Sequence, residues 1–245
     1  MIASLDMYDM PAVRGANDRF WTAIRARLGY GPERLTRGAE PWAVWQSPDL
    51  LLAQTCGMPY RTRLHGRVTL VGTPDHGLPF CPPGHYNSVL LVRAGAGGRR
   101  VQDFAGGVLA YNEALSQSGW AAPMTHLGAL GVRFSRHVAT GAHAASARAV
   151  AEGRADMAGL DALTWEMLKD HDGGLAARLR VIATTSPTPA LPWITALGRD
   201  PAPIAAAIGA AIGDLAPADR AALHLGGLED IPAAAYLAVP TPPGP

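Results

Sequence analysis

The sequence is poor in several residue types on which common functions depend. It has only two cysteines among 245 residues, Cys56 and Cys81, each close to Gly and Pro residues. A structural zinc site needs four Cys or His ligands at short spacings, and no second cysteine pair is present to supply them. The two cysteines are therefore either unlinked thiols or one disulfide between neighbouring loops, and a disulfide requires an oxidising compartment.

An excess of charge of one sign is also missing, as are long hydrophobic runs. Lys and Arg number 21, Asp and Glu number 20, and no block of like charge occurs. No window approaches the roughly 18 apolar residues that a membrane-spanning helix requires. The opening residues "MIASLDMYD" lack the basic start and apolar centre of a signal peptide. The sequence thus predicts no nucleic-acid partner, no membrane span and no export signal in this chain.

Motifs for nucleotide, hydrolytic and metal chemistry are absent as well. No Gly-rich loop ends in Gly-Lys-Ser/Thr, and no Gly-x-Gly-x-x-Gly follows a strand. Neither a Gly-x-Ser-x-Gly elbow nor a His-Glu-x-x-His helix occurs, and the eight histidines are scattered. We therefore expect no catalytic residues, no metal site and no cofactor.

What the sequence does contain is an α/β pattern with enough apolar residues, 48%, for a large core. Residues 2–8 indicate a strand and residues 11–29 a helix that stops at Gly29. Strands are predicted at 49–57, 67–74 and 86–95, and strands then alternate with helices from 107 to 186. Residues 187–195 are extended, residues 202–215 and 218–228 are helical, and residues 234–239 form a short last strand. These patterns predict mixed sheets flanked by helices.

The stretch "NEALSQSGW", residues 112–120, lies between a predicted strand and a predicted helix. The first N–H groups of a helix have no partner within it and carry the positive end of its dipole. Ser116 and Ser118 add hydroxyl groups, and Gly119 allows close approach of the main chain. The stretch is thus suited to a small oxyanion such as a phosphate, phosphonate or carboxylate; alternatively, the serines only cap the helix.

Further polar residues lie at strand ends or in the loops that follow, where open α/β sheets bind ligands. They are Tyr8, Gln54, Thr55, His143 and Asp161. Each also has a structural explanation: Tyr8 as the edge of the core, Thr55 as a turn residue, and His143 and Asp161 as helix caps.

Most of the chain resembles the phosphonate-binding branch of the type II periplasmic solute-binding proteins, which deliver phosphate, phosphite and phosphonates to ABC importers. Segments that carry the resemblance are "GHYNSVLLVRAG", "VQDFAGGVLAYNEALSQSGWAAP", "TGAHAASARAVAEGRADMAGLDALTWEML" and "TTSPTPALPWIT", in this order. The resemblance implies two α/β lobes joined by two hinge crossings that close over the ligand. It places lobe 1 at residues 1–90 and 188–245 and lobe 2 at residues 91–187. It also implies a monomer that works with an importer permease in the periplasm.

The resemblance implies that Ser116, Gln117, Ser118 and Gly119 bind the oxyanion. It adds Tyr8, Gln54, Thr55, His143 and Asp161 to the same ligand site. Gln117 replaces a hydroxyl residue common in the family, and Glu113 would repel a dianion if it pointed inward. The ligand is then a monoanion, or a molecule whose amino group meets Glu113 or Asp161.

Two other functions remain open on the sequence. A cytoplasmic enzyme on the same fold would use His143, Asp161 and Glu113 as acid–base groups, and the missing signal peptide makes the cytoplasm an alternative compartment. A sensor would pass ligand-driven closure to a partner protein, because the chain has no DNA-binding extension of its own.

Overall fold

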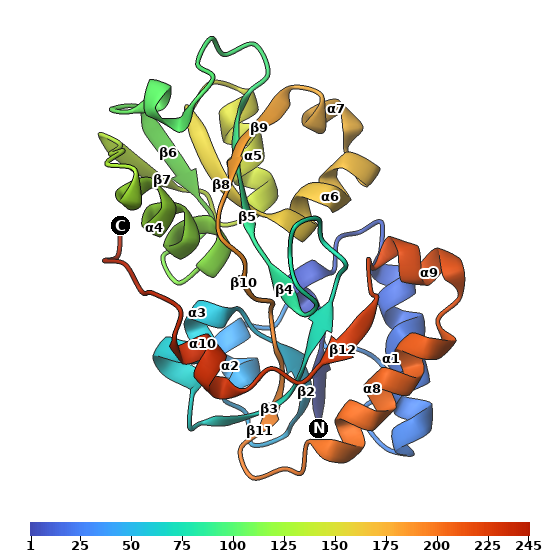
Figure 1. The fold of residues 1–245 in the computed structure, drawn as a ribbon. Coiled ribbons are helices and arrows are strands. Elements are labelled where there is room, and N and C mark those ends of the chain that lie inside the picture. The colour runs from blue at the N-terminus through green and yellow to red at the C-terminus, as the bar shows by residue number, and fades with distance from the viewer. The chain divides into compact units, whose positions relative to one another are not determined.

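The structure is a computed structural model that describes all residues from 1 to 245 (Figure 1). The chain forms two compact units. Unit 1 comprises Met1–His85 and Pro189–Ala238, and unit 2 comprises Tyr86–Thr188 and Val239–Pro245. Strands β4 (His85–Tyr86) and β10 (Thr188–Pro189) pair where the chain passes between the units. The expected lobe boundaries at residues 90 and 187 stay a prediction.

Unit 1 is built on a mixed five-stranded sheet. In spatial order its strands are β1 (Ile2–Ser4), β2 (Leu50–Gln54), β11 (Trp193–Ala196), β3 (Val68–Asp75) and β12 (Gly227–Glu229). β1 and β2 are parallel, whereas β11 runs antiparallel to both β2 and β3. β2 and β3 therefore point the same way. The carboxyl ends of β1, β2 and β3 all lie at one edge of the sheet.

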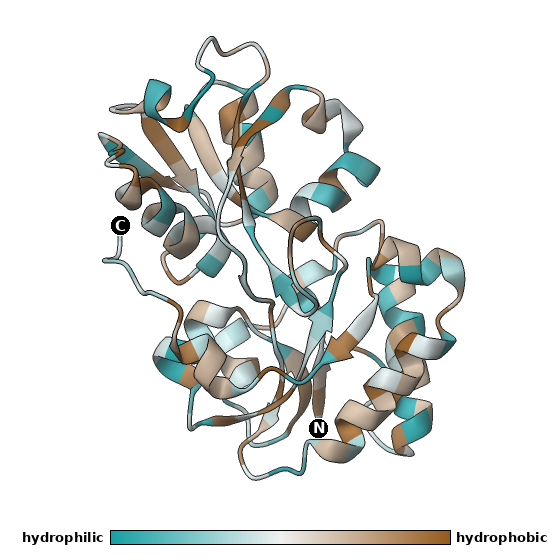
Figure 2. Cartoon of the chain, viewed as in Figure 1, coloured by the Kyte–Doolittle hydropathy of each residue, from teal (hydrophilic) through white to brown (hydrophobic).

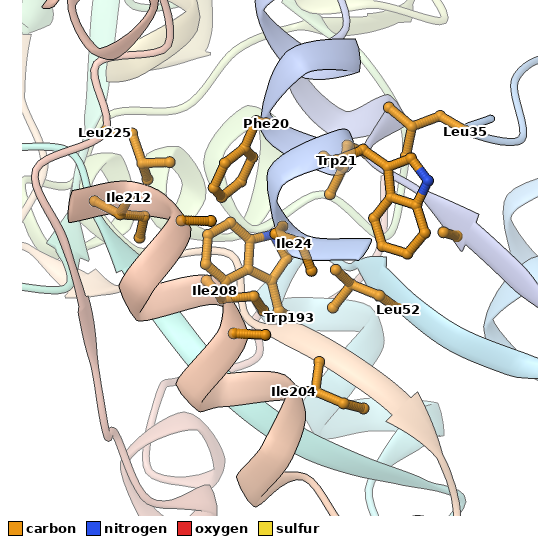
Figure 3. Close-up of a cluster of buried hydrophobic side chains, with 14 of the residues drawn as sticks. Phe20, Trp21, Ile24, Leu35, Leu52, Trp193, Ile204, Ile208, Ile212 and Leu225 are labelled. Carbon is orange, nitrogen blue, oxygen red and sulfur yellow. The ribbon is translucent and has the colours of Figure 1, made fainter. Parts of the chain in front are cut away.

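Helices cover both faces of this sheet. They are η1 (Asp6–Tyr8), α1 (Arg14–Leu28), α2 (Pro41–Trp45), α3 (Gly57–Pro59), η2 (Tyr60–Leu64), α8 (Ala202–Asp214), α9 (Pro217–Ala222) and α10 (Ala233–Leu237). On one face α1 and α8 pack together, and Figure 3 shows Phe20 and Ile24 meeting Ile208 and Trp193 there. The other face packs against α2, η2 and α10. Leu51 and Leu52 of β2 join the first cluster and Leu50 and Ala53 join the second, which explains the unbroken apolar run of this strand.

The start of α1 is anchored by the carboxylate of Asp9, whose side chain is only 7% exposed. Arg37 Nε donates to Asp9 Oδ2 at 2.6 Å and Asn17 Nδ2 donates to Oδ1 at 2.9 Å. Burial opposes ionisation of Asp9, but the hydrogen bonds from Arg37 and Asn17 outweigh it and hold the pKa below its usual value.

Asp9→Asn is expected to lower the free energy of unfolding by about 1 kcal/mol at neutral pH, a value reduced for solvent screening of Arg37. A lowered folded-state pKa favours folding above about pH 4, and this contribution is lost as the pH falls through the folded-state value. Urea unfolding at about pH 7 and about pH 2 measures both effects. The control is Asp49→Asn, at an exposed carboxylate, and an equal effect of the two changes at neutral pH would contradict the prediction.

Two sequence predictions near the end of unit 1 were wrong. Residues 218–228 were expected to be helical, but α9 ends at Ala222 and Gly227–Glu229 form β12. Residues 234–239 were expected to be a strand, but Ala233–Leu237 form α10. Three successive alanines have the highest helix propensity, and Pro232 suits a helix start, so local preference outweighs the β-prone Tyr236. The Tyr236 hydroxyl is tied to Thr73 Oγ1 at 2.6 Å and donates to the Ala190 carbonyl at 2.9 Å.

Unit 2 has a second mixed five-stranded sheet. Its strands, in spatial order, are β7 (Arg136–Ala139), β6 (Val108–Tyr111), β8 (Met157–Asp161), β5 (Ser88–Arg93) and β9 (Leu179–Thr184). β7, β6 and β8 are parallel, and β5 is antiparallel to β8 and β9. In Figure 2 much of β6 and β8 carries the brown shades of hydrophobic residues.

The helices of unit 2 are η3 (Val101–Phe104), η4 (Gln117–Ala121), α4 (Ala122–Ala129), α5 (His143–Ala151), α6 (Ala162–His171) and α7 (Gly173–Ala176). η4 runs directly into α4, and Trp120 and Leu127 of this helix pack on Leu109 and Met157 of the sheet. None of the helices of the chain combines the length and the apolar character that a membrane crossing requires.

Candidate functional site

The candidate site in unit 2 lies where three parallel strands end. β6 leads into the Ser116–Gly119 turn, β7 leads into His143, and β8 ends at Asp161 itself. Because these strands are parallel neighbours, their carboxyl ends share one edge of the sheet. Predicted residues from three separate sequence segments are thus brought to the same edge, in the way ligand-binding edges of α/β sheets are built.

The turn after β6 begins a helix and is capped from within. Ser116 is the N-cap, and its Oγ accepts the Gly119 N–H at 2.9 Å. The amide of Ser118 belongs to the first helical turn, whose N–H groups have no acceptor in the helix. All four residues from Ser116 to Gly119 are buried. The structure thus shows the cap that was one interpretation of Ser116. Oxyanion binding at this helix start stays a prediction.

Ser118 and His143 form a direct pair. Ser118 Oγ lies 3.1 Å from His143 Nε2, and Ser118 as a whole is only 2% exposed. Shielding of the ring from solvent lowers the pKa of His143 to about 4, and the neighbouring Gly159 backbone only partly offsets this. His143 is therefore neutral at physiological pH, so Ser118 is held by a neutral imidazole and not by a cation.

Two carboxylates accompany this edge. Asp161 is 2% exposed and caps α6, accepting the Thr164 N–H at 3.0 Å, so the structural role expected for it is present. Glu113 lies just before the turn, and partial desolvation of its carboxylate by the surrounding protein raises its pKa. Both groups disfavour a further negative charge at the strand ends.

In unit 1 the predicted residues also meet at one edge. Tyr8 is in η1 after β1. Gln54 is the last residue of β2, the parallel neighbour of β1, and Thr55 follows it. Gln54 already makes one hydrogen bond within the protein, because its Nε2 donates to the Leu191 carbonyl at 3.1 Å. Thr55 is different: its Oγ1 is fully buried and has no partner in the protein. Buried hydroxyls are normally hydrogen-bonded, so Thr55 is the stronger ligand-binding candidate of the two.

Sequence reasoning missed His76, which follows the last residue of β3 at this same edge. Its ring lies edge-on to Tyr8, with the centroids 5.5 Å apart. Nδ1 is 2.9 Å from the His224 carbonyl, which can only accept, so Nδ1 carries the proton. Burial lowers the His76 pKa to about 4. Nε2 is therefore a buried acceptor, and it has no partner. The only available signal was its position after the strand at 67–74.

Asn112, the first residue after β6, was missed as well. A Cβ on Gly119 would collide with Asn112 Oδ1 and approach Ser116 Oγ at 3.1 Å. Gly119 is thus required by close packing in the turn.

Cys56 and Cys81 are both free thiols, so the disulfide alternative is wrong. No group of three or more His, Cys, Asp or Glu side chains is placed to hold a metal.

Comparison with known proteins identifies what this chain is similar to. Residues 52–235 match the family described as "ABC transporter, phosphonate, periplasmic substrate-binding protein". Among solved structures, PhnD1 from Prochlorococcus marinus in complex with methylphosphonate superposes with a TM-score of 0.74 at 15% identity, over 96% of this chain and 93% of that one. No curated protein sequence matches the chain.

Two further structures share the fold. A binding protein component of an ABC phosphonate transporter from Pseudomonas aeruginosa has a TM-score of 0.68 at 15% identity and covers 93% of this chain and 80% of that one. A histidine kinase sensor domain with similarity to periplasmic binding proteins has a TM-score of 0.60 at 18% identity, over 88% and 87% of the two chains. The type II periplasmic-binding-protein fold, with two mixed sheets flanked by helices, is thereby confirmed.

Proposed function

The chain belongs to the family of periplasmic substrate-binding proteins of phosphonate ABC transporters, and we propose that its ligand is a small molecule bearing a phosphonate or related oxyanion. The family consists of binding proteins and not of enzymes, so the prediction that the chain is not an enzyme is confirmed. Capture without turnover is accordingly the proposed mechanism, with an importer permease as the partner and the periplasm as the compartment.

One observation supports this ligand class above the others. At the carboxyl edge of β7, β6 and β8, a capped helix start places the Ser118 amide and hydroxyl next to neutral His143. Main-chain and hydroxyl donors preorganised at a helix start offset the hydration that an anion loses on binding. The proposal keeps the expectation that Tyr8, Gln54 and Thr55 of unit 1 contribute to the same ligand.

We further propose that the ligand carries a hydrogen-bond donor of its own. His76 Nε2 is an unpaired acceptor at the carboxyl edge of unit 1. Asp161 and Glu113 add carboxylates in unit 2, and the raised pKa of Glu113 reflects the cost of keeping its charge. A fully ionised phosphonate offers these groups no proton, whereas a hydrogen phosphonate or an aminoalkyl phosphonate does.

Calorimetric titration of the full chain tests the proposed ligand class and the proposed hydrogen-bond donor on the ligand. Methylphosphonate, 2-aminoethylphosphonate, phosphite, phosphate and acetate are compared at one ionic strength. We expect binding of at least one phosphorus oxyanion and weaker binding of methylphosphonate as the pH rises through its second ionisation. Binding of acetate alone, or of none of the five, would contradict the ligand class.

The role of His76 is tested by His76→Leu, which is expected to weaken methylphosphonate binding roughly tenfold because it removes one hydrogen bond to a charged ligand. The control is His171→Leu, at an exposed histidine in the last turn of α6. Equal affinities of the two variants for methylphosphonate would show that His76 does not bind the ligand. They would not contradict the proposed function.

A sensor is the second candidate function, favoured by the similarity to the histidine kinase sensor domain. Both functions require the same ligand capture and differ in the partner that reads it. Reconstitution with the permease separates them, because only an importer receptor stimulates its ATPase activity when loaded.

A further inference from the structure

Unit 1 also has a polar hollow that lies outside the proposed ligand site. It has a volume of about 560 Å³. Its lining includes Trp42, Gln46, Arg61, Arg63, His65 and Arg67. No acidic residue lines it.

This hollow lies at the opposite end of the sheet strands from the candidate ligand edge. Arg67 immediately precedes Val68, the first residue of β3, and Gln46 precedes β2. Thr55, by contrast, follows the last residue of β2. Because β2 and β3 point the same way, the hollow is at their amino ends and the candidate ligand residues are at their carboxyl ends. The two features are therefore separate.

Arg63 and Arg67 of the hollow have N–H donors to spare. Arg63 lies over the Trp42 ring, its guanidinium carbon 5.2 Å from the centroid. Stacking uses the flat face of a guanidinium and leaves the N–H groups at its edge available. Arg63 and Arg67 are exposed, and neither forms an ion pair with a carboxylate. This sets them apart from Arg19, Arg27 and Arg37 of the same unit, each of which is paired with an aspartate.

The walls of the hollow are fixed by buried aromatic neighbours. Trp42 meets Trp45 edge-on at 5.1 Å, and Trp45 in turn donates its Nε1–H to the Gln54 carbonyl at 3.0 Å. On the other side His65 packs edge-on against buried Tyr60 at 6.0 Å. Trp42 and His65 are thus held in place before binding, which reduces the cost of ordering these two walls of the hollow.

We propose that this hollow is a second anion site that takes the phosphate group of a phosphorylated molecule larger than the ligand of the strand-end site. Guanidinium groups match phosphate oxygens with paired N–H donors. The volume lies within the range of about 300–1,000 Å³ found for small-molecule sites, so it accommodates more than one phosphate group. A soluble polyphosphate and an anionic lipid headgroup present the same chemistry.

Calorimetric titration with pyrophosphate tests the site, with excess methylphosphonate present to occupy the strand-end site. We expect wild-type protein to bind one pyrophosphate, and Arg63→Gln/Arg67→Gln to bind it at least tenfold more weakly. The control is Arg34→Gln/Arg136→Gln, which removes the same charge at two exposed arginines outside the hollow and is expected to bind as wild type. All four side chains are exposed, so both double variants should keep the wild-type Tm.

A second arm identifies the source of the phosphate. Sedimentation with vesicles of phosphatidylglycerol and phosphatidylcholine is compared with sedimentation with phosphatidylcholine alone. Vesicle binding that depends on Arg63 and Arg67, without pyrophosphate binding, assigns the site to a lipid headgroup and supports the proposal. The proposal is overturned by failure to bind either probe, by an equal loss in the control pair, or by tighter binding of polyglutamate than of pyrophosphate. The difference between the Arg63/Arg67 variant and the Arg34/Arg136 control does not depend on whether methylphosphonate is the ligand at the other site.

Discussion

Ser118→Ala is expected to weaken binding of the phosphorus oxyanion by about 10- to 100-fold. A hydrogen bond to a charged group contributes about 1.5–3 kcal/mol, and each 1.4 kcal/mol corresponds to a factor of ten in affinity. The change also leaves His143 Nε2 without the hydroxyl that lies 3.1 Å away. Calorimetric titration of wild type and variant with the tightest ligand of the panel measures the effect.

The matched control for this prediction is Ser135→Ala in the same unit. Ser135 Oγ donates to the Gly107 carbonyl at 3.1 Å on the exposed surface. Ser135→Ala should leave the affinity for the ligand unchanged. In the absence of ligand, neither Ser118→Ala nor Ser135→Ala should lower the free energy of unfolding by more than about 1 kcal/mol. If Ser118→Ala binds as tightly as Ser135→Ala, the turn after β6 is not the oxyanion site.

Gly159→Ala is expected to destabilise the protein by about 2–3 kcal/mol and to weaken ligand binding without contacting the ligand. Gly159 lies inside β8, and a Cβ there would overlap the ring of Pro123 and approach the Gly119 carbonyl at 3.3 Å. Overpacking of this kind costs about 1–3 kcal/mol, and relief requires the start of α4 to move away from the sheet. Such a movement shifts the helix start that carries Ser118 and Gly119.

Thermal unfolding and the same titration together test this second prediction. Gly128→Ala, on α4 itself, is the control, because a Cβ at Gly128 meets nothing within 4 Å. It should raise stability by about 0.5–1 kcal/mol through the greater helix propensity of alanine. A Gly159→Ala protein that retains both wild-type stability and affinity would show that the contact between β8 and α4 does not position the turn.

The order of strands and helices was accessible from sequence because it depends on local patterns. The predicted helix ending at Gly29 is confirmed, since α1 ends at Leu28 and Gly29 adopts the left-handed conformation with φ 75°. The strand, turn and helix around residues 107–131 are also present, with Ser116 at the helix start. Strand ends and caps are properties of a few neighbouring residues, so the amino-acid sequence alone is enough to locate the candidate turn.

Features that depend on contacts between distant segments could not be predicted from local sequence patterns. Nothing near residue 76 in the sequence shows that its ring meets Tyr8 and the His224 carbonyl. The hydrogen bond from the Gln54 side chain to the Leu191 carbonyl likewise joins residues far apart in the sequence. β12, which the sequence did not predict, pairs with β3 although the two strands are far apart in the sequence. Each of these facts is set by tertiary packing, which overrides the local pattern.

The position of β11 between β2 and β3 has a consequence for the order in which the chain folds during synthesis. Apart from residues 239–245, unit 2 is complete once residue 188 has left the ribosome, whereas β11 follows at residues 193–196. Until then the facing edges of β2 and β3 lack the strand that joins them. Unpaired edges invite association with other chains, and such long-range pairing forms slowly. We therefore expect unit 2 to fold before unit 1, whose N-terminal strands stay unpaired on these edges for longer.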